Sequence, residues 1–183
     1  KSAKNKQKES GQKVILHKMI KQVSPNYKFY RMHAELIKQL QRVIDGDCKR
    51  LIVSIAPRHG KSELSSRILP AAFLLAHPNK YVSICSYSAE LAEGFSREAR
   101  DYFQEAGGAI DPLNKSVNSW GTEAGGGCWA AGVGGSVVGR SANLIIADDT
   151  IKGREEADSK RAMEKLWDFY RGSLYTRLEP GDS

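Results

Sequence analysis

The sequence predicts an α/β fold in which helices flank a mostly parallel central sheet. Short runs rich in β-branched and aromatic residues, namely "RLIVSI", "KYVSICSYS" and "NLIIAD", alternate with longer stretches whose apolar residues recur at helical spacing. This alternation is typical of parallel strands joined by helical crossovers. A glycine-rich stretch between the second and third runs predicts an insertion of β-hairpins.

Apolar periodicity predicts five helices. They cover about residues 15–23, 32–44, 61–76, 91–102 and 163–178. Pro25 is expected to end the first helix, Pro70 to kink the third, and Ser88 to cap the fourth. Residues 1–11 carry no such periodicity, and we expect them to be disordered.

Three core strands are expected, at residues 50–56, 80–88 and 143–148. Between the last two, residues 107–139 contain ten glycines among 33 residues, so we expect hairpins and loops that lie on the main sheet. Trp120 and Trp129 belong to this stretch, where packing within the hairpins explains them better than base stacking does.

The length of 183 residues suits a single domain with a substantial core. We divide the chain into a basic N-terminal arm with a short helix, residues 1–25, and a main domain, residues 26–183. No signal peptide is apparent and the longest apolar run, "AAFLLA", is too short to cross a bilayer, so we expect a soluble chain without a membrane partner. The three cysteines stand far apart, which argues against a zinc site and a disulfide scaffold and indicates cytosolic thiols.

Positive charge is concentrated near the N-terminus. Residues 1–50 contain 13 Lys and Arg against 4 Asp and Glu, whereas residues 51–183 contain 15 against 17. A basic arm is suited to a polyanion, above all nucleic acid. A solubilising lysine tail explains the same charge, and the residues alone leave both interpretations open.

A candidate phosphate-binding loop lies between the first expected strand and the third expected helix. Glycine exposes backbone N–H groups at the start of a helix, Lys61 can reach outer phosphates, and Ser62 can bind magnesium. The full pattern GxxxxGK[ST] requires glycine where this chain has Ile55. From the residues alone, the loop is either a variant of the pattern or a chance match.

Two adjacent carboxylates follow the third expected strand. Asp148 and Asp149 end the run "LIIADD", and a buried carboxylate pair is costly without a cation beside it. Enzymes with a phosphate-binding loop use acidic groups here to hold magnesium and to position the attacking water. ATP hydrolysis is therefore the favoured interpretation, with a solvated turn as the alternative.

Five stretches, "PRHGKSE", "SYSAELAEGFSREARDYF", "GVGGSVVGRSANLIIADD", "IKGREEADS" and "SLYTRLEPG", resemble one family. It is the DNA-packaging terminase large subunit of tailed phages, in its N-terminal ATPase domain, and the resemblance covers about residues 30–179. Loss of the first loop glycine is common in that family. The resemblance implies a RecA-like additional-strand (ASCE) P-loop NTPase fold with ATP and Mg²⁺ as cofactors.

The resemblance also implies site residues. Lys61 and Ser62 would contact phosphate and magnesium, Asp148 would belong to the metal shell, and Asp149 stands where many relatives have the catalytic glutamate. The shorter Asp149 side chain must reach the water from closer or through a second water. The cofactor-binding residues expected in the loop are Ala56, Pro57, Arg58, His59, Gly60, Lys61, Ser62 and Glu63.

Two arginines and an aromatic segment complete the expected site. Arg58 matches a loop arginine that relatives use to sense or stabilise the outer phosphate, and Arg140 resembles one supplied to a neighbouring subunit. A structural ion pair is the alternative for either arginine. Relatives recognise adenine on the segment "YKFYRMH", which makes Tyr30, Arg31 and His33 candidates, although an ordinary helix start explains these residues equally well.

The resemblance implies a motor that translocates double-stranded DNA into a procapsid. Expected partners are double-stranded DNA, further copies of the chain in a ring, the portal protein and the small terminase subunit, all in the host cell cytoplasm. We expect no nuclease activity from this chain. Another P-loop enzyme, such as a helicase or a small-molecule kinase, and a non-catalytic nucleotide- and DNA-binding module are the alternatives.

Overall fold

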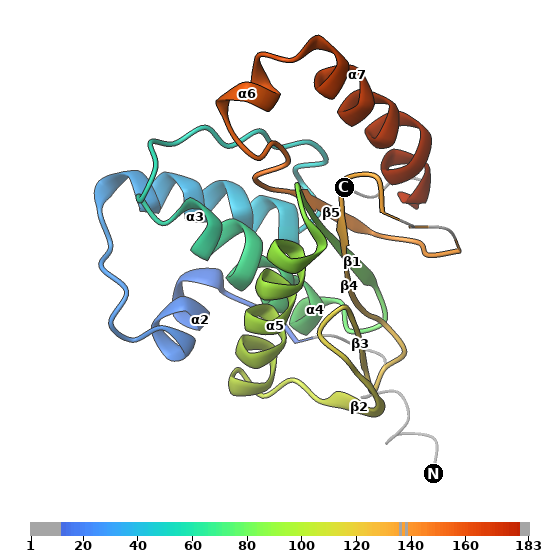
Figure 1. Cartoon of the computed structure of the whole chain (residues 1–183). Coiled ribbons are helices and arrows are strands. Elements are labelled where there is room, and N and C mark those ends of the chain that lie inside the picture. Colours follow the sequence, from blue (N-terminus) through green and yellow to red (C-terminus); the bar gives the residue numbers. More distant parts are fainter. Residues whose placement is uncertain (1–11, 136, 138, 180–183) are drawn as a thin grey trace.

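One sheet of five strands forms the centre of the molecule (Figure 1). The strands are β1 (Tyr81–Ser86), β2 (Ile110–Lys115), β3 (Ser119–Thr122), β4 (Gly127–Gly132) and β5 (Leu144–Ala147). They lie in the order β2-β3-β4-β1-β5. This computed structural model describes residues 12–135, 137 and 139–179, so the expected disorder of residues 1–11 falls outside the described residues.

Helices precede, separate and follow the strands. They are α2 (Leu16–Val23), α3 (Arg31–Ile44), the π-helix η1 (Glu63–Ile68), α4 (Leu69–Ala76), α5 (Ala89–Glu105), α6 (Arg154–Ala157), α7 (Lys160–Phe169), the π-helix η2 (Tyr170–Leu174) and the 3₁₀-helix η3 (Tyr175–Arg177). All five expected helical regions are confirmed. Ser88 caps α5, since its hydroxyl accepts a hydrogen bond from the N–H of Leu91.

The sheet is mixed, which corrects the expectation of a mostly parallel sheet. Strand β1 pairs in parallel with β4 and β5, whereas β2 with β3 and β3 with β4 pair antiparallel. The glycine-rich stretch does form hairpins, but they extend the sheet instead of lying on it. Gly126, just before β4, allows the chain to pass close to the segment that leads into β1. A Cβ at that position would lie 2.5 Å from the carbonyl oxygen of Pro78.

The strand expected at residues 50–56 does not form, so that prediction is wrong. Residues 51–56 have no regular secondary structure, and Ile52 is 95% exposed. A cavity of about 480 Å³ lies between Leu51, Ile52 and Val53 on one side and β5 on the other. The apolar segment therefore has strand-like composition but pairs with none of the described strands, and pairing is what makes a strand.

Apolar side chains form two cores, one on each face of the sheet. Val82 and Ile84 of β1 contribute to the larger core with α2, α3, η1, α4 and α5. Cys85 faces the other side, with Trp129, Phe169 and Leu174. Figure 1 shows α2 to α5 on one side of the sheet and α7 on the other. The alternation along β1 is that of a strand buried on both faces.

Helix α2 packs into the main core. Leu16 and Ile20 are fully buried, and the N–H of Leu16 donates to Gln41 of α3 at 2.8 Å. The described part of the arm, residues 12–25, thus shares its core with residues 26–183. Within the described residues, no helix combines the length and apolar character that a bilayer crossing requires.

Helix α7 is less buried than its periodicity suggests. Met163 is 40% exposed and Trp167 56%, while Phe169 and Leu174 at the end of the segment are buried. Only the C-terminal part of the segment covers the sheet, together with η2. The apolar spacing therefore predicted the helix correctly, while two of its large apolar side chains, Met163 and Trp167, stay exposed.

Candidate functional site

The candidate site lies at the carboxyl ends of β1 and β5, where the chain leaves two parallel strands. Asp148 directly follows β5, and its N–H donates to the carbonyl of Cys85 in β1 at 3.0 Å. Lys61 stands at the start of the helix that leads into η1, and its Nζ lies 2.6 Å from Oδ1 of Asp148. In open α/β sheets, this end of the strands is where ligands bind.

The structure brings together two residues that are 87 positions apart in the chain. Sequence motifs placed both residues in one site, and the structure brings them together although the strand expected before Lys61 does not form. Asp148 is 5% exposed and Lys61 29%, so the pair is partly shielded from water. A shielded ion pair interacts more strongly than a surface pair.

The charge of Asp148 depends on its neighbours. Burial raises its pKa, but hydrogen bonds from Lys61, Ser66 and Ser62 and the charge of Lys61 lower it, and the net result is a pKa below the ordinary value. Burial lowers the pKa of Lys61, whereas the hydrogen bonds and charges of Asp148 and Asp149 raise it, with a net increase. Both shifts keep the pair ionised at neutral pH.

Ser66 is a site residue that the sequence did not reveal. Its hydroxyl is fully buried and donates to Oδ2 of Asp148 at 2.6 Å. Ser66 lies in η1, where the N–H of Leu69 bonds the carbonyl of Leu64, five residues earlier. Pro70 lacks an N–H and cannot bond the carbonyl of Ser66, and η1 gives way to α4 just before it. The kink expected at Pro70 stays a prediction. The four-residue spacing of Ser62 and Ser66 was the only sequence signal.

Asp149 is placed to act outside the buried pair. Its side chain is 56% exposed, and its Oδ1 lies 3.7 Å from Nζ of Lys61. Its backbone has φ +47°, a left-handed conformation that Asp tolerates better than most residues, and its carbonyl accepts the N–H of Tyr87 at 2.8 Å. The two aspartates thus have different environments, with one carboxylate fixed and buried and the other exposed beside the same lysine.

The loop before Lys61 turns tightly. Arg58 has φ +62° and Gly60 has φ +74°, and Nδ1 of His59 lies 2.7 Å from the carbonyl oxygen of Pro57. Ala56, Pro57, Arg58 and His59 are exposed. In the part of the chain that the structure describes, no ion pair involves Arg58, and its role at an outer phosphate stays a prediction.

Glu63 is engaged by neighbouring side chains. The hydroxyl of Tyr102 in α5 donates to its Oε1 at 2.6 Å, and Arg67 donates to its Oε2 at 2.8 Å. Burial and the hydrogen bond to Glu63 raise the pKa of Tyr102, so the hydroxyl stays a donor. Glu63 therefore connects the helix after the loop to α5.

The three adenine candidates differ in their surroundings. Tyr30 is 61% exposed and Arg31 is exposed, so both side chains are free to contact a ligand. His33 is 3% exposed, and both its ring nitrogens are engaged: the N–H of Tyr30 donates to Nδ1, and Nε2 lies 2.9 Å from the carbonyl oxygen of His59. His33 contacts the loop itself, while adenine binding by Tyr30 and Arg31 stays a prediction.

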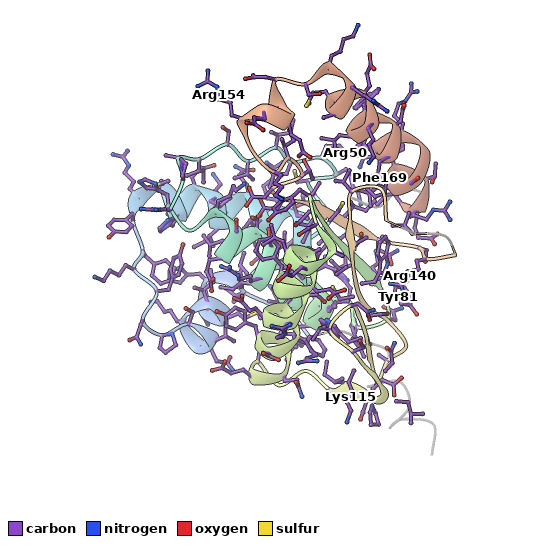
Figure 2. The ribbon with its side chains drawn as sticks, viewed as in Figure 1. Arg50, Tyr81, Lys115, Arg140, Arg154 and Phe169 are labelled. Atoms are coloured by element: carbon purple, nitrogen blue, oxygen red, sulfur yellow. The ribbon has the colours of Figure 1, made fainter. Side chains whose placement is uncertain are left out.

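Arg140 lies at the opposite end of the sheet. It lines a cavity of about 250 Å³ with Tyr81, the first residue of β1, and its guanidinium carbon lies 5.8 Å from the Trp129 ring centroid. Figure 2 shows Arg140 beside Tyr81. Asp148 lies beside the other end of β1, where its N–H bonds the carbonyl of Cys85. The two ends of β1 are five residue steps apart, about 16 Å at ~3.3 Å per residue. Arg140 therefore does not reach the Lys61–Asp148 pair of its own chain.

Two oxygen-bearing side chains of the site, those of Ser62 and Asp148, lie within hydrogen-bonding distance of each other. In the described parts of the chain, no cluster of three or more His, Cys, Asp and Glu residues is suited to hold a metal. Magnesium at nucleotide sites keeps several waters and takes only one or two protein oxygens beside those of phosphate. The hydroxyl of Ser62, hydrogen-bonded to the Asp148 carboxylate, provides such a pair of oxygens.

The site thus combines a tight loop, a lysine, two hydroxyls and two carboxylates in different environments at one end of the sheet. A scan against protein-family models finds no match for the chain, and a search of the curated proteins finds none either.

Proposed function

We propose that the chain is a magnesium-dependent ATPase whose hydrolysis drives translocation of double-stranded DNA, as the resemblance to terminase large subunits implies. The observation that carries the proposal is the contact between Lys61 and Asp148, 2.6 Å apart, at the carboxyl ends of two parallel strands. A RecA-like P-loop fold, a ring of subunits and a role in filling a procapsid are parts of the same proposal.

Lys61 would move from Asp148 to phosphate when nucleotide binds. In the structure, its Nζ lies within 3.7 Å of two carboxylates. The positive charge of Lys61 is therefore already at the site and could pair with a phosphate group instead. A positive group at this position stabilises the charge that develops on the transferred phosphoryl group. Asp148 keeps the hydroxyl of Ser66 when Lys61 turns away, so its carboxylate does not lose every partner.

Magnesium, when bound through Ser62 and Asp148, would neutralise charge on the phosphate oxygens. Asp149 would orient the attacking water and accept its proton, because its exposed carboxylate is the one that solvent can reach. Arg58, exposed in the loop, can turn toward an outer phosphate. Arg140 would serve the site of a neighbouring subunit, since it is remote from the site of its own chain.

The assignment of Asp149 is tested by separating binding from hydrolysis. We expect Asp149→Ala to bind Mg-ATP within about threefold of wild type, because the lysine and hydroxyls are untouched, and to lose 10²-fold or more of turnover, roughly the loss typical of a general base. Equilibrium binding and phosphate release measure the two effects. Turnover at the wild-type rate in Asp149→Ala would remove the residue from the mechanism. If the assembled wild-type protein binds Mg-ATP but does not hydrolyse it, a non-catalytic binding module is favoured.

DNA contacts are expected to involve phosphates, because a packaging motor must accept any sequence. The affinity for double-stranded DNA should then fall linearly with the logarithm of salt concentration, with a slope of about −0.9 per phosphate contacted. Binding of two unrelated duplexes over a salt series measures this slope. Affinity that depends on sequence and hardly on salt would contradict the proposed DNA contact. In a separate unwinding assay, separation of the DNA strands would favour a helicase.

A further inference from the structure

Aromatic side chains from the first turn of α3 and from the segment before it contact one face of the loop that precedes Lys61. Tyr27 and His33, which we call the aromatic clamp, have ring centroids 5.2 Å apart. His33 is 3% exposed and lies in the first turn of α3. The clamp lies against His59 and Gly60, and this contact gives the loop a second attachment besides its covalent continuation into the helix.

The hydrogen-bond partners of His33 determine where its ring proton lies. The backbone N–H of Tyr30 is 3.2 Å from Nδ1 and can only donate, so Nδ1 accepts. In the neutral ring, the proton is then on Nε2, which donates to the carbonyl oxygen of His59 at 2.9 Å. His33 thereby fixes the direction of the His59 carbonyl.

Fixing this carbonyl also fixes an N–H group. A trans peptide is planar, so the N–H of Gly60 points opposite to the carbonyl of His59 and away from His33. Backbone N–H groups of a loop that leads into a helix are the usual phosphate ligands in proteins. We propose that His33 is a positioning residue, which holds the peptide between His59 and Gly60 so that the Gly60 N–H faces bound phosphate. This role rests on the proposed nucleotide-binding function.

Tyr27 closes the space on the clamp side of the loop. A Cβ at position 60 would collide with the hydroxyl of Tyr27 and lie 3.5 Å from Nε2 of His33, and Gly60 has φ +74°. Only glycine fits this conformation without strain. The Tyr27 hydroxyl is buried and has no hydrogen-bond partner among the described residues. Tyr27 therefore affects the loop by occupying the space beside Gly60 and not by a hydrogen bond of its hydroxyl. The loop therefore cannot collapse toward α3.

Two substitutions separate the bond to the loop from the bond to Tyr30. In His33→Gln, the amide nitrogen can occupy the place of Nε2 and donate to His59. In His33→Asn, the shorter amide oxygen can occupy the place of Nδ1 and accept from Tyr30, but nothing reaches His59. Thermal unfolding of both variants checks that the fold is kept, and Lys61→Ala gives the background for nucleotide binding.

The first measurement is Mg-ATP binding by the 183-residue chain. We expect His33→Asn to weaken binding about threefold to tenfold, the range of one hydrogen bond, and His33→Gln to stay within about twofold of wild type. A purely structural role would weaken both variants in proportion to their loss of thermal stability. Equal binding by His33→Asn and wild type would overturn the proposal.

A second measurement does not require ATP hydrolysis or ATP binding. The amide signal of Gly60 is followed by NMR while magnesium pyrophosphate is added. We expect the signal to shift in wild type and in His33→Gln, and to respond weakly in His33→Asn. If Mg-ATP fails to bind but this pattern is seen, the proposed ATPase fails while the role of His33 stands. A Gly60 signal that responds in no protein, or equally in all three, would overturn that role.

Discussion

At the scale of single residues, Lys61 and Asp148 dominate the candidate site. Asp148 has three hydrogen-bonding partners, one of them charged, and its pKa is held below the ordinary value despite burial. Removing Lys61 would leave a buried carboxylate with hydroxyl partners only. We expect Lys61→Ala to lower the free energy of unfolding by about 1–3 kcal/mol, less than for a fully buried pair because Lys61 is 29% exposed. Urea unfolding at neutral pH measures this, and no loss would mean that the pair is not a stabilising contact.

The same pair makes a prediction for pH. Because the folded pKa of Asp148 lies below its ordinary value of 3.8, the stability it contributes is present above that value and is lost as pH falls through the folded pKa. The stability difference between wild type and Asp148→Asn should therefore be constant near neutral pH and shrink below about pH 4. Unfolding curves for both proteins over an acid series test the sign. A difference that grows on acidification would contradict the shift.

Sequence motifs identified some of these residues and missed others. Lys61, Ser62 and Asp148 follow from local patterns, because a loop between apolar segments and an acid after a strand can be recognised in one dimension. The hydrogen bond of Ser66 to Asp148 spans 82 residues, and that of His33 to the loop spans 26. Such contacts depend on how α3, η1 and β5 pack, which periodicity does not encode.

At the scale of elements, the junction between β4 and α5 depends on a glycine. A Cβ at Gly132 would lie 2.6 Å from the backbone nitrogen of Ala89 and 2.9 Å from the carbonyl carbon of Ser88. These backbone atoms belong to the cap of α5 and cannot move aside alone. We expect Gly132→Ala to destabilise the protein by about 1–3 kcal/mol, as overpacking does in well-packed interiors. Urea unfolding of the purified variant gives the value.

Gly94, inside α5, is the matched control. A Cβ there has no neighbouring atom within 4 Å, so Gly94→Ala adds only helix propensity. We expect it to stabilise the protein by about 0.5–1 kcal/mol. Opposite signs for the two variants would confirm that close approach at the start of α5 sets the cost. The same sign for both would contradict that explanation.

The expected strand at residues 50–56 is the clearest failure at this scale. Its composition is as strand-like as that of β5. However, β-propensity measures how well side chains pack against a neighbouring strand, and it does not measure an intrinsic preference of the backbone. Here the neighbouring space is a cavity. The mixed sheet was missed for a related reason: glycine content predicted hairpins, but whether a hairpin lies on a sheet or extends it depends on contacts such as that of Gly126 with Pro78.

At the scale of the whole molecule, the two functional arginines expected from the resemblance lie in different places. Arg58 is in the loop of the site, whereas Arg140 is at the other end of the sheet. If Arg140 completes a neighbour's site, turnover per subunit should rise with protein concentration, and Arg140→Ala should lose 10³-fold or more of the activity of the assembled form, roughly the value of an arginine finger. Activity independent of concentration would make Arg58 the stronger candidate.

In the proposed function, the Lys61–Asp148 pair marks an ATP site, and substitution of Lys61 tests this assignment. ATP turnover and Mg-ATP binding are compared for wild type and Lys61→Ala over a wide range of protein concentration, with thermal unfolding to show that the variant is folded. We predict Mg-ATP binding and turnover that Lys61→Ala abolishes. Equal binding and equal turnover in a folded Lys61→Ala protein would show that this pair does not form an ATP site.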